Sequence, residues 1–152
     1  MGRKVFNRLL HGYFQVTRGL TIGVRAVLRF DDGKFLLVRH TYVPGWHFPG
    51  GGVEKGLTTR HTLDKELRQE TGLELVGNPK LHGVFFNPAV SKQDHVLVYL
   101  CNFKGVLSEK PTSMEIAEVG LFGLNDLPAG TDPGTERRIR EIVDGVEPRD
   151  EW

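Results

Sequence analysis

The chain has 152 residues, of which 39% are hydrophobic, and this length and composition favour one folded domain over residues 1–152. Its 20 basic and 19 acidic side chains give a net charge of +1, which argues against a protein that binds nucleic acid through bulk charge, so we expect no DNA partner. The balance hides an asymmetry, because residues 1–30 contain six Lys or Arg and no Asp or Glu. The rest of the chain is therefore acidic overall.

The only cysteine, Cys101, excludes an internal disulfide and a cysteine-built zinc site. It lies in an apolar run, which favours a small buried side chain over a nucleophile. No apolar stretch approaches the length of a transmembrane helix, and the N-terminus lacks the features of a secretory signal. We therefore expect a cytoplasmic protein without a transmembrane segment.

The first elements follow from apolar spacing. Residues 1–18 are expected to contain an amphipathic helix, since apolar side chains recur at helical spacing within residues 3–17 and basic ones lie between them. The helix is expected to pack on the domain, with a membrane surface or a partner in a homodimer as the alternatives. Alternation predicts a strand over residues 21–30, and the turn Asp31-Asp32-Gly33 leads into a second strand over 34–40.

A loop rich in Pro and Gly is expected over residues 43–56, followed by a helix over 58–71 that Gly72 terminates. Further strands are expected at residues 81–86, 95–103 and 119–124, a last helix at 135–143 and a frayed tail at 147–152. Mixed strands with few helices predict an α/β or α+β sandwich.

A group of carboxylates and glycines indicates a candidate metal and ligand site. Glu66 and Glu70 are four residues apart on the predicted helix, so they face the same way without a basic neighbour one turn away. A divalent cation would relieve their repulsion, and hard oxygen ligands suit Mg²⁺ or Mn²⁺. A solvated helix face is the competing interpretation. Glu54 on the loop could supply a third carboxylate, and the triplet of Gly50, Gly51 and Gly52 permits close approach of a ligand to the backbone.

The stretch from Gly51 to Leu73, GGVEKGLTTRHTLDKELRQETGL, resembles a Nudix box, whose pattern is G-x5-E-x7-R-E-U-x-E-E-x-G-U with U aliphatic. The matching positions are Gly51, Glu66, Leu67, Glu70, Gly72 and Leu73, with the spacing kept throughout. The resemblance extends over about residues 20–128. It implies an α/β fold, specifically a Nudix-like α/β/α sandwich with a mixed β-sheet.

Three box positions depart from the pattern. Leu57 replaces a glutamate, Lys65 replaces the arginine, and Gln69 replaces the first of the paired glutamates. Lysine keeps the charge but loses the planar fork of arginine, and glutamine offers an oxygen without charge. Fewer anionic ligands should weaken metal binding. The departures therefore leave two alternatives open: a working but atypical enzyme, or a weak or inactive module that binds a nucleotide-like ligand. A scaffold role through the N-terminal helix is a third.

The resemblance implies a hydrolase that uses Mg²⁺ or Mn²⁺ to cleave the pyrophosphate linkage of a nucleoside diphosphate joined to another group. It also implies the site residues. Glu66, Glu70 and Glu115 are the expected catalytic carboxylates, and the metal ligands are expected among Glu54, Glu66, Gln69 and Glu70. The substrate-binding candidates are Arg25, Arg39, Gly50, Gly51 and Gly52. Salt bridges at a strand edge are the alternative for the two arginines, and a surface position before a strand is the alternative for Glu115.

Overall fold

The computed structural model describes residues 9–10, 12–14, 16–108 and 110–152. Within these residues the strands form two sheets, in the orders β4–β1–β6–β5 and β3–β2–β7. The first sheet consists of β1 (Thr21–Val27), β4 (Gly50–Gly52), β5 (Glu74–Phe86) and β6 (Asp94–Lys104). The second consists of β2 (Phe35–His40), β3 (Trp46–His47) and β7 (Ile116–Phe122).

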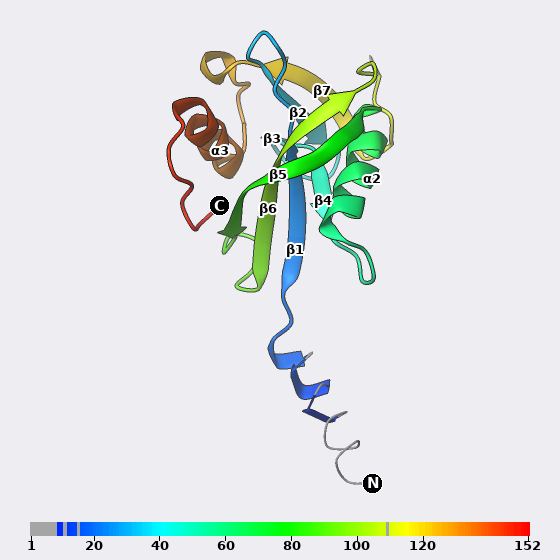
Figure 1. Ribbon diagram of the computed structural model, residues 1–152, viewed down its shortest axis with the longest axis vertical. Coiled ribbons are helices and arrows are strands. Elements are labelled where there is room, and N and C mark those ends of the chain that lie inside the picture. The colour runs from blue at the N-terminus through cyan, green and yellow to red at the C-terminus, as the bar shows by residue number, and fades with distance from the viewer. Residues whose placement is uncertain (1–8, 11, 15, 109) are drawn as a thin grey trace.

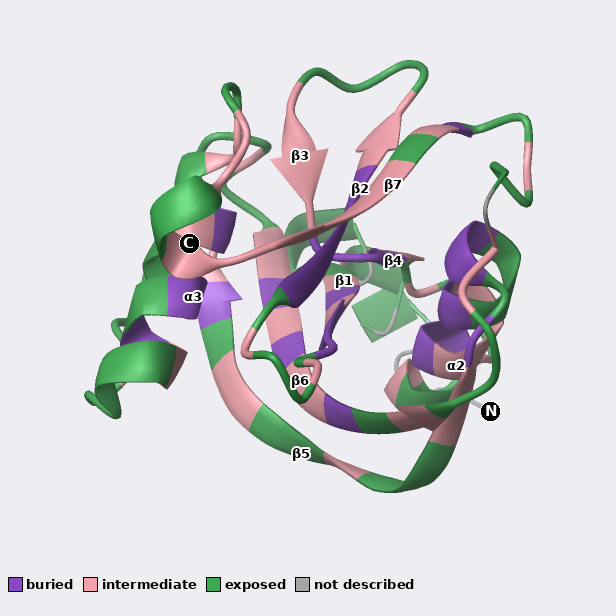
Figure 2. Cartoon of the chain, turned by 90° about the horizontal axis from the view of Figure 1, so that it is seen from above, coloured by how far each residue is buried: buried purple, intermediate pink, exposed green. Residues whose placement is uncertain are grey.

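The helices lie on opposite sides of these sheets, as Figures 1 and 2 show. Helix α2 (Thr59–Thr71) lies beside β4, and helix α3 (Pro133–Asp144) follows the short 3₁₀ turn η1 (Leu124–Asp126) on the other side. Strand β1 runs parallel to β6 and antiparallel to β4, so the first sheet is mixed. The predicted α/β sandwich with a mixed sheet is therefore confirmed. No helix of the described residues is long and apolar enough to cross a lipid bilayer.

The core explains why the strands lie where they do. Residues Phe35–Val38 of β2 are fully buried, as expected for a run that is apolar on both faces. Leu63 and Leu67 of α2 pack with one side of this strand, whereas Phe85 and Ile139 belong to a second cluster on the other side. The central strand thus joins two hydrophobic clusters, each covered by one helix.

Strand β5 begins seven residues earlier than the sequence predicts, at Glu74 rather than at position 81. Polar residues, Gly77 and Pro79 obscure the alternation in this part of the chain. Pairing with β6 nevertheless holds it, with register shifts that accommodate the irregular stretch.

The C-terminal residues do not fray, contrary to the expectation for 147–152. The backbone of Phe86 donates a hydrogen bond to the Asp150 carbonyl and accepts one from the Trp152 amide, at 2.8 and 2.9 Å. The Trp152 indole N–H also reaches the Asp132 carboxylate at 3.1 Å. Because the last residues add backbone hydrogen bonds to the end of β5, they form part of the folded domain.

The expectation that the N-terminal helix packs on the domain is also wrong for its described part. Residues 9–10, 12–14 and 16–17 are helical, and they project from the sandwich as a stem that leads into β1 (Figure 1). The expected positions 3–8, 11 and 15 lie outside the described residues. Apolar side chains on the stem, including Leu9 and Tyr13, are mostly exposed because the domain does not cover them.

Candidate active site

Helix α2 presents the two carboxylates predicted from the sequence. The Thr58 side chain caps its first turn by accepting a hydrogen bond from the His61 amide, and Gly72 ends it in a left-handed conformation, with φ of 77°. Leu63 and Leu67 lie beside the carboxylates on the buried side of the helix, and their packing in the core fixes its rotation. Glu66 and Glu70 therefore point together toward the glycines of β4, as the spacing predicts.

Glu70 is buried, with 5% of its surface exposed, and both of its oxygens are held. Oε1 lies 2.8 Å from Nε2 of His40, and Oε2 accepts a hydrogen bond from the Gly50 amide at 2.9 Å. These contacts join α2 to the end of β2 and to β4. Each carboxylate oxygen has a further lone pair, so the group keeps capacity for another ligand.

The glycines of β4 allow the helix to approach the sheet. Gly50, Gly51 and Gly52 pair with Arg25, Val24 and Gly23 of β1. A Cβ atom at Gly51 would lie 2.7 Å from Cδ of Glu66, and one at Gly50 would overlap the Val24 carbonyl. At Gly52 a Cβ would meet nothing within 4 Å. Gly50 is therefore needed for the close approach of β4 to the Val24 backbone, and Gly51 leaves room for the Glu66 carboxylate, whereas Gly52 has open space around it.

Negative charge gathers around Glu66. Its burial raises the pKa of the Glu66 carboxyl above the ordinary value of 4.5, and the charge of Glu70 raises it further. Lys65 opposes this shift, whereas Glu115 adds to it. Partial burial, followed by the charges of Glu115 and Glu70, also raises the pKa of the Tyr42 phenol. The structure thus brings Glu115 into the electrostatic neighbourhood of the helix carboxylates, and we call Glu66, Glu70 and Glu115 the carboxylate cluster.

The other two predicted metal ligands, Glu54 and Gln69, are more exposed than Glu66 and Glu70. Glu54 is exposed on the loop, and its carboxylate lies 3.5 Å from Nζ of Lys65, the residue at the arginine position of the box. Gln69 is exposed on α2, and its backbone carbonyl accepts a hydrogen bond from Thr112. Among the described residues, no three His, Cys, Asp or Glu side chains are already arranged to hold a metal ion.

The two arginines that were predicted to bind substrate have different partners in the structure. Arg39 pairs with Glu118 across β2 and β7, with Nη2 2.7 Å from the carboxylate, which is the salt-bridge alternative. Arg25 is half-buried opposite Gly50, and its positive charge lowers the pKa values of Glu66 and Tyr42. Its buried Nε has no hydrogen-bond partner within the described chain, although Nη1 donates to the Val24 carbonyl at 3.2 Å. Arg25 is thus the better placed of the two for a ligand at the cluster.

Sequence reasoning missed the role of His40. A histidine at the end of a strand carries no spacing signal that links it to a glutamate 30 residues later. The interpretation of Cys101 as a buried side chain is confirmed, and burial raises the pKa of its thiol to about 12. Such a thiol does not supply a thiolate at neutral pH.

Several known proteins are similar to this chain in sequence. Residues 19–143 match the family model described as NUDIX domain. The Nudix hydrolase YvcI of Bacillus subtilis is 38% identical over 71 residues, which cover 47% of this chain and 43% of the relative. An ADP-ribose pyrophosphatase of Methanocaldococcus jannaschii is 30% identical over 100 residues, which cover 64% and 59% of the two chains. The chain thus spans less than two thirds of the length of these curated relatives.

Solved structures share the fold. A MutT NUDIX hydrolase from Burkholderia pseudomallei superposes with a TM-score of 0.68 at 24% identity, over 80% of this chain and 96% of that one. A NUDIX hydrolase from Nitrosomonas europaea gives a TM-score of 0.71 at 19% identity, over 84% and 91%. At these identities the likeness extends to the fold alone.

Proposed function

The chain belongs to the NUDIX-domain family, and on this premise we propose that it is a metal-dependent hydrolase. Its reaction is cleavage of the pyrophosphate linkage in a nucleoside diphosphate joined to another group. An ADP-ribose pyrophosphatase and an RNA pyrophosphohydrolase are among the proteins that it resembles. Both of these relatives are named for cleaving a pyrophosphate, which supports the reaction class without selecting the substrate.

The carboxylate cluster is the observation that carries this proposal. Glu70 is fixed through both oxygens by His40 and the Gly50 amide, one helical turn from Glu66. The raised pKa of Glu66 means that its environment disfavours the negative charge when no cation is present. A solvated helix face would neither bury Glu70 nor raise the pKa of Glu66, so the geometry favours a site that receives positive charge.

The donor set fits a hard divalent cation. Mg²⁺ retains several waters and is commonly held by one or two carboxylates together with substrate phosphates, so a complete protein cage is not needed. Glu66 and Glu70 would supply those carboxylates, and the predicted ligands Glu54 and Gln69 would have to turn toward them. When bound, Mg²⁺ or Mn²⁺ would neutralise the diphosphate and lower the pKa of a coordinated water.

The chain's own residues would then orient the substrate. Arg25 has an unpartnered guanidinium nitrogen beside the cluster and would donate to a phosphate oxygen. The backbone at Gly50–Gly52 would line the phosphate site, because the absence of side chains permits close approach. Glu66 and Glu115 would be the candidates for accepting the proton of the attacking water. Arg39, already paired with Glu118, is the weaker substrate ligand.

The test is hydrolysis of a panel of nucleoside diphosphate derivatives, including ADP-ribose and a 5′-triphosphorylated RNA, with Mg²⁺ or Mn²⁺. We expect metal-dependent turnover that falls by about a hundredfold or more in Glu66→Gln and Glu70→Gln. Glu147→Gln, an exposed carboxylate outside the cluster, is the matched control and should keep full activity. Turnover that survives both cluster substitutions would contradict the proposal.

The alternative is a module that binds a nucleotide-like ligand and turns it over slowly or not at all. It is favoured by the salt bridge between Glu54 and Lys65, which engages an expected metal ligand, and by the neutral side chain of Gln69. Saturable binding of ADP-ribose in calorimetry, without product formation over many hours, would select this alternative.

A single buried thiol suits the reducing cytoplasm, where we expect the protein to act on a small diphosphate substrate. Fractionation of cells that express the intact chain would test this location.

A further inference from the structure

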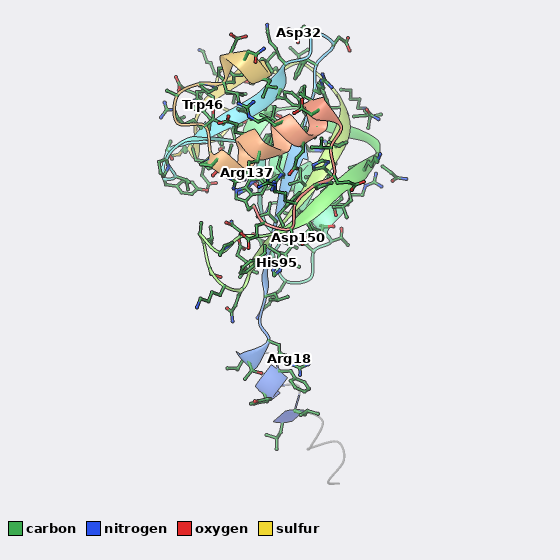
Figure 3. The ribbon with its side chains drawn as sticks, turned by 90° about the vertical axis from the view of Figure 1, so that its left-hand side faces the viewer. Arg18, Asp32, Trp46, His95, Arg137 and Asp150 are labelled. Atoms are coloured by element: carbon green, nitrogen blue, oxygen red, sulfur yellow. The ribbon has the colours of Figure 1, made fainter. Side chains whose placement is uncertain are left out.

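The N-terminal stem carries an apolar face that the domain leaves uncovered. Leu9, Tyr13 and Val16 follow one another at spacings of four and three residues, which places them on one side of a helix. Their exposed fractions are 69%, 62% and 82%. Figure 3 shows the stem, with Arg18 at its upper end, extending away from the sandwich.

The charge of this segment has one sign. Residues 1–18 contain four Lys or Arg and no Asp or Glu, and of these four basic residues the structure describes Arg18. The described Arg18 guanidinium lies 4.3 Å from the centre of the Phe14 ring. A helix that combines an apolar face with basic residues is typical of segments that lie in the headgroup region of a membrane.

Charge also decides between a lipid surface and a second copy of the chain. Two stems packed together would place basic segments side by side with no acidic residue within them to compensate. The acidic domain of a second copy is a poor partner, because many of its carboxylates already contact basic side chains of their own domain, as Glu118, Glu136 and Glu141 do. An anionic surface offers uncompensated negative charge together with an apolar layer.

We propose that this stem binds an anionic lipid surface, with the face of Leu9, Tyr13 and Val16 inserted and the basic side chains toward the headgroups. The interaction is reversible, because a short helix with few inserted side chains anchors weakly compared with a transmembrane segment. It places the domain at the surface without involving the carboxylate cluster.

Co-sedimentation of the full chain with vesicles tests the proposal. We expect binding to vesicles of equal parts phosphatidylcholine and phosphatidylglycerol, little binding to phosphatidylcholine alone, and release by salt. The double variant Tyr13→Glu, Val16→Glu should bind at least about tenfold more weakly. The matched control Val90→Glu, Val106→Glu adds the same charge at exposed apolar positions of the domain and should bind nearly as the wild type does.

The basic residues of the N-terminal segment have their own test. Arg8→Gln with Arg18→Gln should weaken binding by about fivefold for each charge removed, whereas Lys92→Gln with Lys110→Gln on the domain should not. Equal binding by the stem and domain variants would overturn the proposal. So would failure of the wild type to bind anionic vesicles, or concentration-dependent self-association that the stem variants abolish, which would assign the face to a second copy.

Discussion

Nε2 of His40 lies 2.8 Å from Oε1 of Glu70, so a strand end and a helix 30 residues apart meet at a buried carboxylate. The other oxygen of Glu70 accepts a hydrogen bond from the Gly50 amide. This contact fixes the orientation of one member of the carboxylate cluster before any ligand arrives.

Replacing His40 by Ala should lower the free energy of unfolding by about 1–3 kcal/mol, because it leaves a buried carboxylate oxygen without its partner. Urea denaturation in the absence of divalent ions measures this change. His61→Ala removes an exposed histidine from the same helix and should cost much less. Equal losses in the two variants would show that the contact with Glu70 contributes nothing.

Gly51→Ala should reduce turnover by about tenfold to a hundredfold while the fold persists. The new methyl group would displace the Glu66 carboxylate, from which a Cβ would be only 2.7 Å away, and small misplacements of a reacting group are costly. Gly52→Ala is the matched control, since its Cβ meets nothing within 4 Å. Steady-state kinetics of the two variants compare the positions directly, and similar rates would contradict the required close approach.

The pH dependence of stability should reveal the raised pKa of Glu66. A carboxyl whose pKa is higher in the folded state destabilises that state once it ionises, so the loss grows as the pH rises above the ordinary value of 4.5. Without divalent ions, Glu66→Gln should therefore be more stable than the wild type near neutral pH. The difference should vanish in acid. Thermal unfolding at several pH values measures it, and a constant difference would exclude this origin.

Arg138 of α3 lies on the side of the sandwich away from α2, and its substitution should lower stability. It is fully buried, pairs with Glu141 through two nitrogens and lies 4.0 Å from the centre of the Phe85 ring. Arg138→Met should cost about 3–5 kcal/mol of unfolding free energy, since it leaves Glu141 buried without its main partner. Arg140→Met, which breaks an exposed pair with Glu136, should cost less than about 1 kcal/mol.

Glu141 should also give an acid-dependent signal. Burial alone would raise its pKa, but hydrogen bonds from Arg138 and His82 hold the pKa below the ordinary value of 4.5. A lowered pKa contributes stability above the unfolded-state value, and this contribution disappears as the pH falls through the folded-state value. The wild type should thus lose stability in acid more steeply than Glu141→Gln. Parallel pH profiles would contradict this.

Local signals predicted much of the fold. Thr58 and Gly72 mark the ends of α2 because caps depend on neighbouring residues, and the apolar run Phe35–Val38 indicates a buried strand by its composition. Helical spacing likewise aligned Glu66 with Glu70.

The remaining features depend on contacts between distant parts of the chain. The pairing of His40 with Glu70 arises only when β2 and α2 pack together, and no periodicity encodes it. The docking of Trp152 on the end of β5 is likewise a tertiary contact. The short polar segment 147–152 has no local pattern that predicts it. Arg39 and Arg25 look alike in the sequence, and only the position of Glu118 on β7 distinguishes them.

Binding of a divalent cation by Glu66 and Glu70 can be measured with Mn²⁺ by electron paramagnetic resonance. We expect saturable binding by the wild type and by Glu147→Gln, and binding weakened by about tenfold or more in Glu66→Gln. Equal Mn²⁺ affinity in all three proteins would contradict it.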